Sequence, residues 1–440
     1  MLREYYEQFK DSIQPLAISK GFADIEVDVS EYEGGFPRPE EAPCAVNFVS
    51  LVDQDTRTLW VYVLINTENQ SQVDFFQKNY SEDSPAHWTE DNNEWIRGAL
   101  DTWFVDEKKP DNNLAHFQVL WFEDELDLLK AFYAQVHACK LDVLGGWNFY
   151  FDLKTIATRL RDHHGVDPTT VMCPKKFPVK AINIREDNFS VDVADKAHTL
   201  DVTGWHHNAD LQYYYASIRK GRGTKESMKL GDILLEEIGE TKLELEGDHR
   251  TAPFINFENY LIYSGLDSYR LFQMEMQNKD IDLMFNASLF THTRLEKVMR
   301  KTISLRNLAA RFFWENGNVL SNNHNKFLDE ESEKFKGAFV ANALLMANVG
   351  IPLNGQNSIN IFEDVIDEDF ASLYPRIILA YNIDSNTLIG KIVCEDNPFI
   401  HEYFGEIVST GDNVMIGHKV LGLPSFSEIL DNIGDLVGQE

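Results

Sequence analysis

Cysteine is scarce in this sequence. The four cysteines, Cys44, Cys139, Cys173 and Cys394, lie far apart and form no Cys-x-x-Cys pair. Zinc knuckles and disulfide-stapled domains need closely spaced or paired cysteines. We therefore expect reduced, buried thiols, and neither a zinc site nor a disulfide framework.

Long apolar runs are also missing. The longest unbroken run covers 59–65, whereas a membrane-spanning helix needs roughly 20 apolar residues. The first residues mix charges of both signs with aromatic side chains, unlike a signal peptide. We expect a globular cytoplasmic protein that has no membrane partner.

Positive charge is in short supply, because 40 Lys and Arg face 71 Asp and Glu, for a net charge of -31. Nucleic-acid binding normally relies on a basic surface, so DNA binding here would depend on local clusters of cations. Arg219, Lys220 and Arg222 form one cluster, which we take as a candidate DNA contact, and a second recurs along 294–306. Each cluster can equally be a solvated face that offsets acidic neighbours.

The order of predicted elements indicates an α/β protein. The 440 residues, 43% of them hydrophobic, are enough for two or three domains. Strands are predicted at 21–29, 45–52 and 59–65, which form an antiparallel meander, and further strands at 117–122 and 142–144 alternate with helices. This order fits a ribonuclease-H-like sheet, although the pattern alone also fits other α+β folds.

The first chemical motif is Asp24-Ile25-Glu26 in the first predicted strand. Because strand side chains alternate, both carboxylates project from the same face of the sheet. Mg²⁺ and Mn²⁺ prefer such oxygen ligands, and a pair of these ions can catalyse phosphodiester cleavage. Two exposed acids on an edge strand would give the same pattern.

Two further motifs follow at the ends of predicted elements. Asn148-Phe149-Tyr150-Phe151-Asp152 comes directly after a glycine-marked strand end, and the next helix is predicted from about Asp152. Tyr263 and Asp267 are spaced i and i+4, so they share one face of a helix. Taken singly, Asp152 could be a helix N-cap beside core aromatics. Tyr263 and Asp267 could be a pair on an exposed helix face.

Taken together and in this order, the three motifs resemble the exonuclease motifs of family B, phage-type DNA polymerases. The resemblance implies that Asp24, Glu26, Asp152 and Asp267 bind two Mg²⁺ or Mn²⁺ ions, and that Tyr263 orients the attacking water. It also implies that Asn148 and Phe151 contact the DNA end. The Asn148–Phe151 spacing is one residue shorter than in many phage relatives and is the spacing of protein-primed relatives.

The segment Asp369-Phe370-Ala371-Ser372-Leu373-Tyr374-Pro375 resembles the first palm motif of the same family. The resemblance implies that Asp369 and the Phe370 carbonyl bind the two ions of a polymerase site, and that Leu373 and Tyr374 contact the incoming nucleotide. Upstream, Phe335-Lys336-Gly337-Ala338 resembles the loop that joins the exonuclease and palm domains, so Phe335 and Gly337 are expected to contact the template strand.

Other parts of that family's pattern are missing from the sequence. Neither the fingers motif, a Lys followed by Asn-Ser-x-Tyr-Gly, nor the second palm motif, Asp-Thr-Asp, is found. We expect an N-terminal lead at 1–20, an exonuclease domain at 21–285, a helical connector at 286–335 and a partial α+β palm at 336–440. This division resembles one half of a split polymerase, and a truncated reading frame or fragment would look the same.

The expected activity is 3′-to-5′ exonuclease proofreading, with single-stranded and primer–template DNA as substrates. DNA synthesis would require a second polypeptide carrying fingers, remaining palm and thumb, and only then would a dNTP bind. Two alternatives stay open, namely a stand-alone repair exonuclease and a non-catalytic structural subunit of a replication complex. If the protein has a phage origin, it would act in the host cytoplasm.

Overall fold

The structure is a computed structural model that describes residues 17–79, 104, 111, 113–188, 190–222, 227–318 and 373–381. The chain divides into two compact units, Met1–His324 and Asn325–Glu440, and each is treated separately below. Phe335, Gly337, Asp369 and Phe370 lie outside the described residues, as does the strand expected at 359–367.

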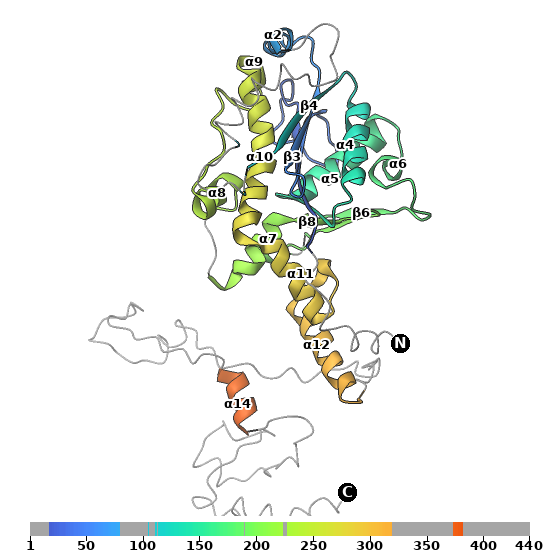
Figure 1. Cartoon of the computed structure of the whole chain (residues 1–440), viewed down its shortest axis with the longest axis vertical. Helices are drawn as coiled ribbons and strands as arrows, with labels where there is room; N and C mark the ends of the chain where they lie inside the picture. The colour runs from blue at the N-terminus through green and yellow to red at the C-terminus, as the bar shows by residue number, and fades with distance from the viewer. Residues whose placement is uncertain are drawn as a thin grey trace, which may run out of the picture. The chain divides into compact units, whose positions relative to one another are not determined.

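The first unit is built on a six-stranded sheet (Figure 1). Its strands are β1 (Lys20–Val27), β2 (Val46–Asp53), β3 (Thr58–Leu64), β4 (His116–Phe122), β5 (Val143–Gly146) and β8 (His207–Asp210), in the order β4-β3-β2-β1-β5-β8. β1, β2 and β3 form the predicted antiparallel meander, and β4, β5 and β8 join by parallel pairing. Every strand except β2 therefore runs in the same direction.

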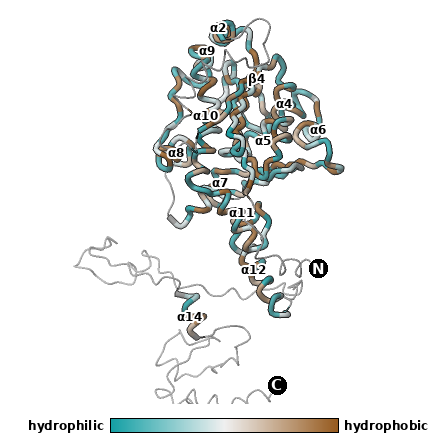
Figure 2. The backbone as a smooth tube through the Cα atoms, viewed as in Figure 1, coloured by the Kyte–Doolittle hydropathy of each residue, from teal (hydrophilic) through white to brown (hydrophobic). Residues whose placement is uncertain are grey.

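Helices cover both faces of this sheet, as the alternation of its side chains requires. On one face, Phe22, Phe48 and Val61 pack in a core shared with α10 (Phe257–Asn278). On the other, Ala23, Val49 and Tyr62 pack in a second core shared with helices of the other layer. Those helices are α4 (Glu125–Cys139), α5 (Phe149–Thr158) and α6 (Pro168–Met172). Figure 1 shows α10 and α4 on opposite sides of the strands, and Figure 2 shows apolar segments in both layers.

Helix α5 starts earlier than the sequence suggested. It begins at Phe149 rather than near Asp152, so Asp152 lies in the first turn and not at the helix start. The cause is Asn148, whose left-handed backbone (φ 57°, ψ 45°) turns the chain sharply after β5, a conformation that Asn tolerates better than most residues. Helix α5 continues into a π-helical turn at Arg159–His163.

Smaller elements surround the sheet. The strands β6 (Ile182–Arg185) and β7 (Thr199–Val202) pair separately, and short helices fill the remaining connections. Those helices are α2 (Gln70–Asn79), η3 (Val193–Asp195), α7 (Leu211–Arg219), η4 (Lys220–Arg222), α8 (Leu230–Ile238) and α9 (Ala252–Ile255). None of the described helices combines the length and apolarity needed to cross a bilayer.

The helical segment expected after residue 286 is present, with a break in the middle. It consists of α11 (Asp280–Thr291), η5 (Leu295–Lys297) and α12 (Lys301–Glu315). The expected boundary at 285/286 falls within α11, and the first unit extends to His324, so the division into domains stays a prediction. In the second unit, α14 (Leu373–Tyr381) is the described helix.

Candidate metal centre

Three predicted carboxylates meet between β1 and α10. Asp24 and Glu26 project from the same face of β1, and Asp267 faces them from α10. One ligand oxygen from each lies within 4.8 Å of the others. Alternation along the strand places Asp24 and Glu26 on one face, and the packing of α10 against the sheet brings Asp267 to them.

Close packing of α10 on the sheet brings Asp267 to the strand. Gly265 faces β3 so tightly that an added Cβ would lie 3.1 Å from Leu59 Cδ2. One residue past Asp267, the Ser268 hydroxyl shares a 2.7 Å hydrogen bond with the Ser50 hydroxyl of β2. Glycine and serine are small enough to let the helix backbone approach the strands.

Asp152 joins the same charged neighbourhood from α5. Its side chain is 4% exposed, and its Oδ2 atom has no hydrogen-bond partner within the described part of the chain. Burial, and then the charges of Asp24, Asp210 and Glu26, raise the pKa of Asp152 well above its usual range. Asp267 Oδ1 is likewise buried without a partner among the described residues.

The cluster has more negative charge than its protein surroundings balance. Burial and the nearby Asp267 carboxylate raise the pKa of Asp24 to about 7, although Lys242 opposes this shift. Burial and the charges of Asp24 and Asp267 raise the pKa of Glu26 well above its usual value. Buried and half-buried like charges, with oxygens that lack partners, are what a bound divalent cation would neutralise, so these residues fit a Mg²⁺ or Mn²⁺ site.

Tyr263 lies on the same face of α10 as Asp267, one turn earlier. Its ring stacks on Tyr260 at 6.0 Å and meets the His249 ring edge-on at 5.8 Å. Burial and the Asp267 charge raise the pKa of the Tyr263 phenol above its usual value, so it stays protonated at neutral pH. The hydroxyl is therefore held at the cluster as a neutral hydrogen-bonding group.

Lys242 belongs to this site and was missed by sequence reasoning. Its ammonium donates to Asp267 Oδ2 and lies 3.3 Å from the Tyr263 hydroxyl oxygen. Burial disfavours its charged form, but Asp267, Tyr263 and Asp24 outweigh this effect and raise the pKa of Lys242 well above its usual value. It follows α8 in a segment without regular structure, so no periodicity could have placed it at the site.

Asn148 and Phe151 lie at the start of α5, where the resemblance expected DNA contacts. Asn148 is exposed and its side chain does not cap the helix. The Phe151 ring lies 5.0 Å from the ring of Phe36, which is 79% exposed. Burial raises the pKa of Asp210, at the end of β8, to about 6, and nearby backbone N–H groups, including those of Asn148 and Phe149, oppose this rise.

Two cations of the basic cluster at 219–222 form ion pairs with acidic neighbours. The Arg219 guanidinium donates to Asp280 at 2.8 Å and lies 4.0 Å from the centre of the Tyr215 ring. Lys220 donates to Asp195 at 2.5 Å, and the Arg222 side chain lies outside the described residues. The structure therefore gives Arg219 a structural partner, and DNA binding by this cluster stays a prediction.

Of the predicted palm residues, the described part of the chain contains two. Leu373 starts α14, and Tyr374 follows it with 63% of its surface exposed. The ligands expected at Asp369 and Phe370 precede this helix, outside the described residues. The polymerase part of the prediction is thus not tested by the geometry.

Comparisons with known proteins agree with this geometry. Residues 90–208 match the family model of the DNA polymerase family B exonuclease domain. The DNA-directed DNA polymerase of Escherichia phage RB69 is 20% identical over 395 residues, which is 89% of this chain and 38% of that relative. The α/β, ribonuclease-H-like prediction is confirmed for this region. The chain therefore contains a region, 90–208, that is similar to the exonuclease domain of family B DNA polymerases.

Proposed function

We propose that this chain hydrolyses DNA from its 3′ end in a divalent-metal-dependent reaction and proofreads for a polymerase. The observation that supports this most strongly is the convergence of Asp24, Glu26 and Asp267 within 4.8 Å. The raised pKa values of Asp24 and Glu26 and the unpartnered oxygen of Asp152 support the binding of a cation there. The match of 90–208 to the family B exonuclease domain supports hydrolysis of a DNA end as the reaction.

In this proposal, Asp24, Glu26, Asp152 and Asp267 would hold two divalent ions. Such ions supply Lewis-acid activation of water and neutralise charge at the leaving oxygen. Water attacks the terminal phosphorus, and the P–O3′ bond breaks. The leaving 3′ oxygen takes up a proton, which balances the one released by the attacking water. The products are a nucleoside 5′-monophosphate and a strand that is one nucleotide shorter and ends in a 3′ hydroxyl.

Residues around the carboxylates would position the reactants. The neutral Tyr263 hydroxyl would hydrogen-bond the attacking water, and the Lys242 ammonium, 3.3 Å away, would fix that hydroxyl. The same cation would stabilise negative charge that grows on the phosphate oxygens. Asn148 and the Phe151–Phe36 ring pair would receive the unpaired 3′ end, since aromatic side chains stack on any base.

The polarity of hydrolysis tests this proposal. On a 3′-labelled single strand with Mg²⁺, the first product should be a labelled mononucleotide, whereas a 5′-labelled strand should shorten stepwise. Asp152→Ala should nearly abolish both, because it removes a buried ligand. Glu123→Ala removes an exposed acid outside the site and should hydrolyse normally. Shortening from the 5′ end, or equal rates for the two variants, would contradict the proposal.

We further propose that Asp369, Phe370 and Tyr374 contribute part of a polymerase palm. The support is the resemblance of 369–375 to the family's first palm motif and the relative's greater length, of which this chain spans 38%. A second polypeptide with fingers, remaining palm and thumb would complete the site and bind the dNTP. Primer extension should then appear only after mixing the two chains, and Asp369→Ala should remove it while hydrolysis continues.

A further inference from the structure

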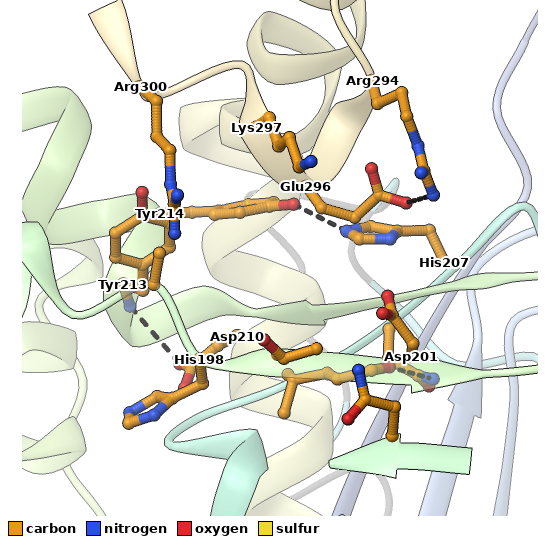
Figure 3. Close-up of a pocket in the computed structure, with 15 residues that line it drawn as sticks. His198, Asp201, His207, Asp210, Tyr213, Tyr214, Arg294, Glu296, Lys297 and Arg300 are labelled. Carbon is orange, nitrogen blue, oxygen red and sulfur yellow. Dashed lines mark hydrogen bonds and ion pairs between the residues drawn. The ribbon is translucent and has the colours of Figure 1, made fainter. Parts of the chain in front are cut away.

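A second polar pocket lies beside the exonuclease region and contains none of the four candidate metal ligands. It has a volume of about 330 Å³ and is enclosed by the ends of β7 and β8, the start of α7 and the segment around η5. This volume is at the lower end of the range of small-molecule sites. Figure 3 shows Arg294, Lys297 and Arg300 on one side and Asp201 and Asp210 on the opposite side.

The pocket is lined by three cations and three acids, but among the described residues only one of the cations is paired with an acid. Arg294 pairs with Glu296 at 3.0 Å. Within the described part of the chain, neither Lys297 nor Arg300 forms an ion pair. Both side chains are exposed, so their charges are accessible to an anionic ligand.

Of the two acids on the opposite side, Asp210 already has hydrogen-bond partners. Asp210 caps α7, accepting from the backbone N–H groups of Gln212 and Tyr213. Asp201 is the remaining lining carboxylate without a partner among the described residues. Two unpaired cations thus stand against one unpaired acid, so the pocket can accept an anionic group at its cationic side.

The middle of the pocket carries flat rings and polar atoms. The Tyr214 hydroxyl and His207 Nε2 are 2.8 Å apart, and the two rings are nearly parallel, at 14°. Asn208 Oδ1 is buried and has no hydrogen-bond partner within the described residues. Rings and an unsatisfied acceptor next to cations suit a ligand that combines a phosphate with a flat polar ring.

We propose that this pocket binds a nucleotide, with its phosphate at Lys297 and Arg300. The nucleotide is either part of a DNA strand or a free nucleoside 5′-monophosphate. The pocket adjoins the exonuclease region, because its lining residue Asp210 pairs with Gly146 of β5, two residues before Asn148. The inference goes beyond the proposed hydrolysis and does not depend on the metal centre.

The test measures binding by the full chain in EDTA, where metal-dependent hydrolysis is absent. A labelled single strand is titrated in a fluorescence anisotropy assay, and deoxyadenosine monophosphate in a calorimeter. The pocket variant is Lys297→Ala with Arg300→Ala. The matched control is Lys301→Ala with Arg306→Ala, which removes the same charge from exposed positions outside the pocket. Thermal melting verifies that all variants are folded.

We expect the pocket variant to bind one of the two ligands about tenfold more weakly and the control to change less than twofold. If the strand is the ligand, the salt dependence should also fall by roughly 0.7 per lost phosphate contact. Weaker binding of the monophosphate alone would identify the free nucleotide as the ligand of the pocket. The double variant Lys297→Arg with Arg300→Lys should retain binding. Equal losses in the pocket and control variants, or no loss in either, would overturn the proposal.

Discussion

Asp24 shows at the scale of one residue why the candidate site needs a cation. Its carboxylate lies in one cluster with those of Glu26 and Asp267. Burial, and then the charge of Asp267, raise its pKa to about 7. Only the deprotonated form is a good ligand for a hard cation. Metal binding and proton binding therefore compete at this position.

This competition predicts how activity depends on pH. At limiting Mg²⁺, the rate of DNA hydrolysis should increase from about pH 6 to pH 8, because Asp24 loses its proton in this range. Saturating Mg²⁺ should shift the increase to lower pH, since the ion favours the carboxylate. The measurement is an initial rate at several pH values and two Mg²⁺ concentrations. A rate independent of pH at limiting Mg²⁺ would contradict the assignment.

Lys242 provides a second prediction at this scale. Lys242→Ala should lower kcat roughly 10²-fold, because a preorganised donor is lost beside the reacting phosphate. Lys242→Arg should recover part of the rate, since it restores the charge but not the ammonium geometry. Lys229→Ala, which removes an exposed cation at the start of α8, is the control and should leave kcat unchanged. Unchanged kcat in Lys242→Ala would exclude a role in the reaction.

The residues of the strand and helix motifs differ from Lys242 in how far the sequence could predict their positions. Asp24 and Glu26 share a face because strands alternate, and Tyr263 and Asp267 share a face because helices repeat every 3.6 residues. Lys242 reaches the site from an irregular segment between two helices. Its position follows from the tertiary packing of that segment, which has no local pattern.

At the scale of elements, the site depends on how closely α10 approaches the sheet. Gly265 lies between Tyr263 and Asp267 in sequence and packs against Leu59 and Val61 of β3. A side chain here would push the helix away from β1 and separate Asp267 from the two strand carboxylates. The glycine is therefore needed for packing, whereas its φ angle is ordinary for a helix.

Gly265→Val should accordingly destabilise the protein by about 1–3 kcal/mol, the usual effect of overpacking. It should also lower the rate of DNA hydrolysis by more than the smaller fraction of folded protein explains. Urea unfolding measures the first effect and the rate at saturating Mg²⁺ the second. Gly221→Val is the control, because an added Cβ there meets nothing within 4 Å. Equal stability of the two variants would show that α10 can shift without penalty.

Element boundaries show the limit of pattern reasoning. The strands of the meander were predicted to within about two residues, because their apolar runs are bounded by turn residues. The start of α5 was missed by three residues, because the left-handed backbone of Asn148 ends the turn early. The pairing of β4 with β3 is a long-range contact that no local pattern specifies.

For the whole molecule, the buried carboxylates link stability to pH and metal. The pKa values of Asp24, Glu26 and Asp152 are all raised, so the folded state holds their protons more tightly than the unfolded chain. Their contribution to stability is then fully present below the ordinary carboxyl pKa of about 4 and is lost as pH rises through their raised pKa values, which for Asp24 is about 7. A divalent ion would restore it.

We therefore predict that, without metal, wild-type protein loses thermal stability relative to Asp24→Asn as pH rises from about 5 to 8. The comparison removes the contributions of all other groups, including His206, whose burial lowers its pKa to about 4. Mg²⁺ should raise the Tm of the wild type more at pH 8 than at pH 5, with a smaller effect on the variant. Parallel Tm curves for the two metal-free proteins would be evidence against the raised pKa.

Asp267→Ala tests most directly whether the carboxylates of β1 and α10 form one metal-dependent exonuclease site. The measurement is hydrolysis of a single DNA strand by wild type and variant over a range of Mg²⁺ concentrations, with folding verified by thermal melting. Loss of several kcal/mol of transition-state stabilisation predicts a rate lower by roughly 10³-fold. A folded Asp267→Ala protein that hydrolyses DNA at the wild-type rate would contradict the account.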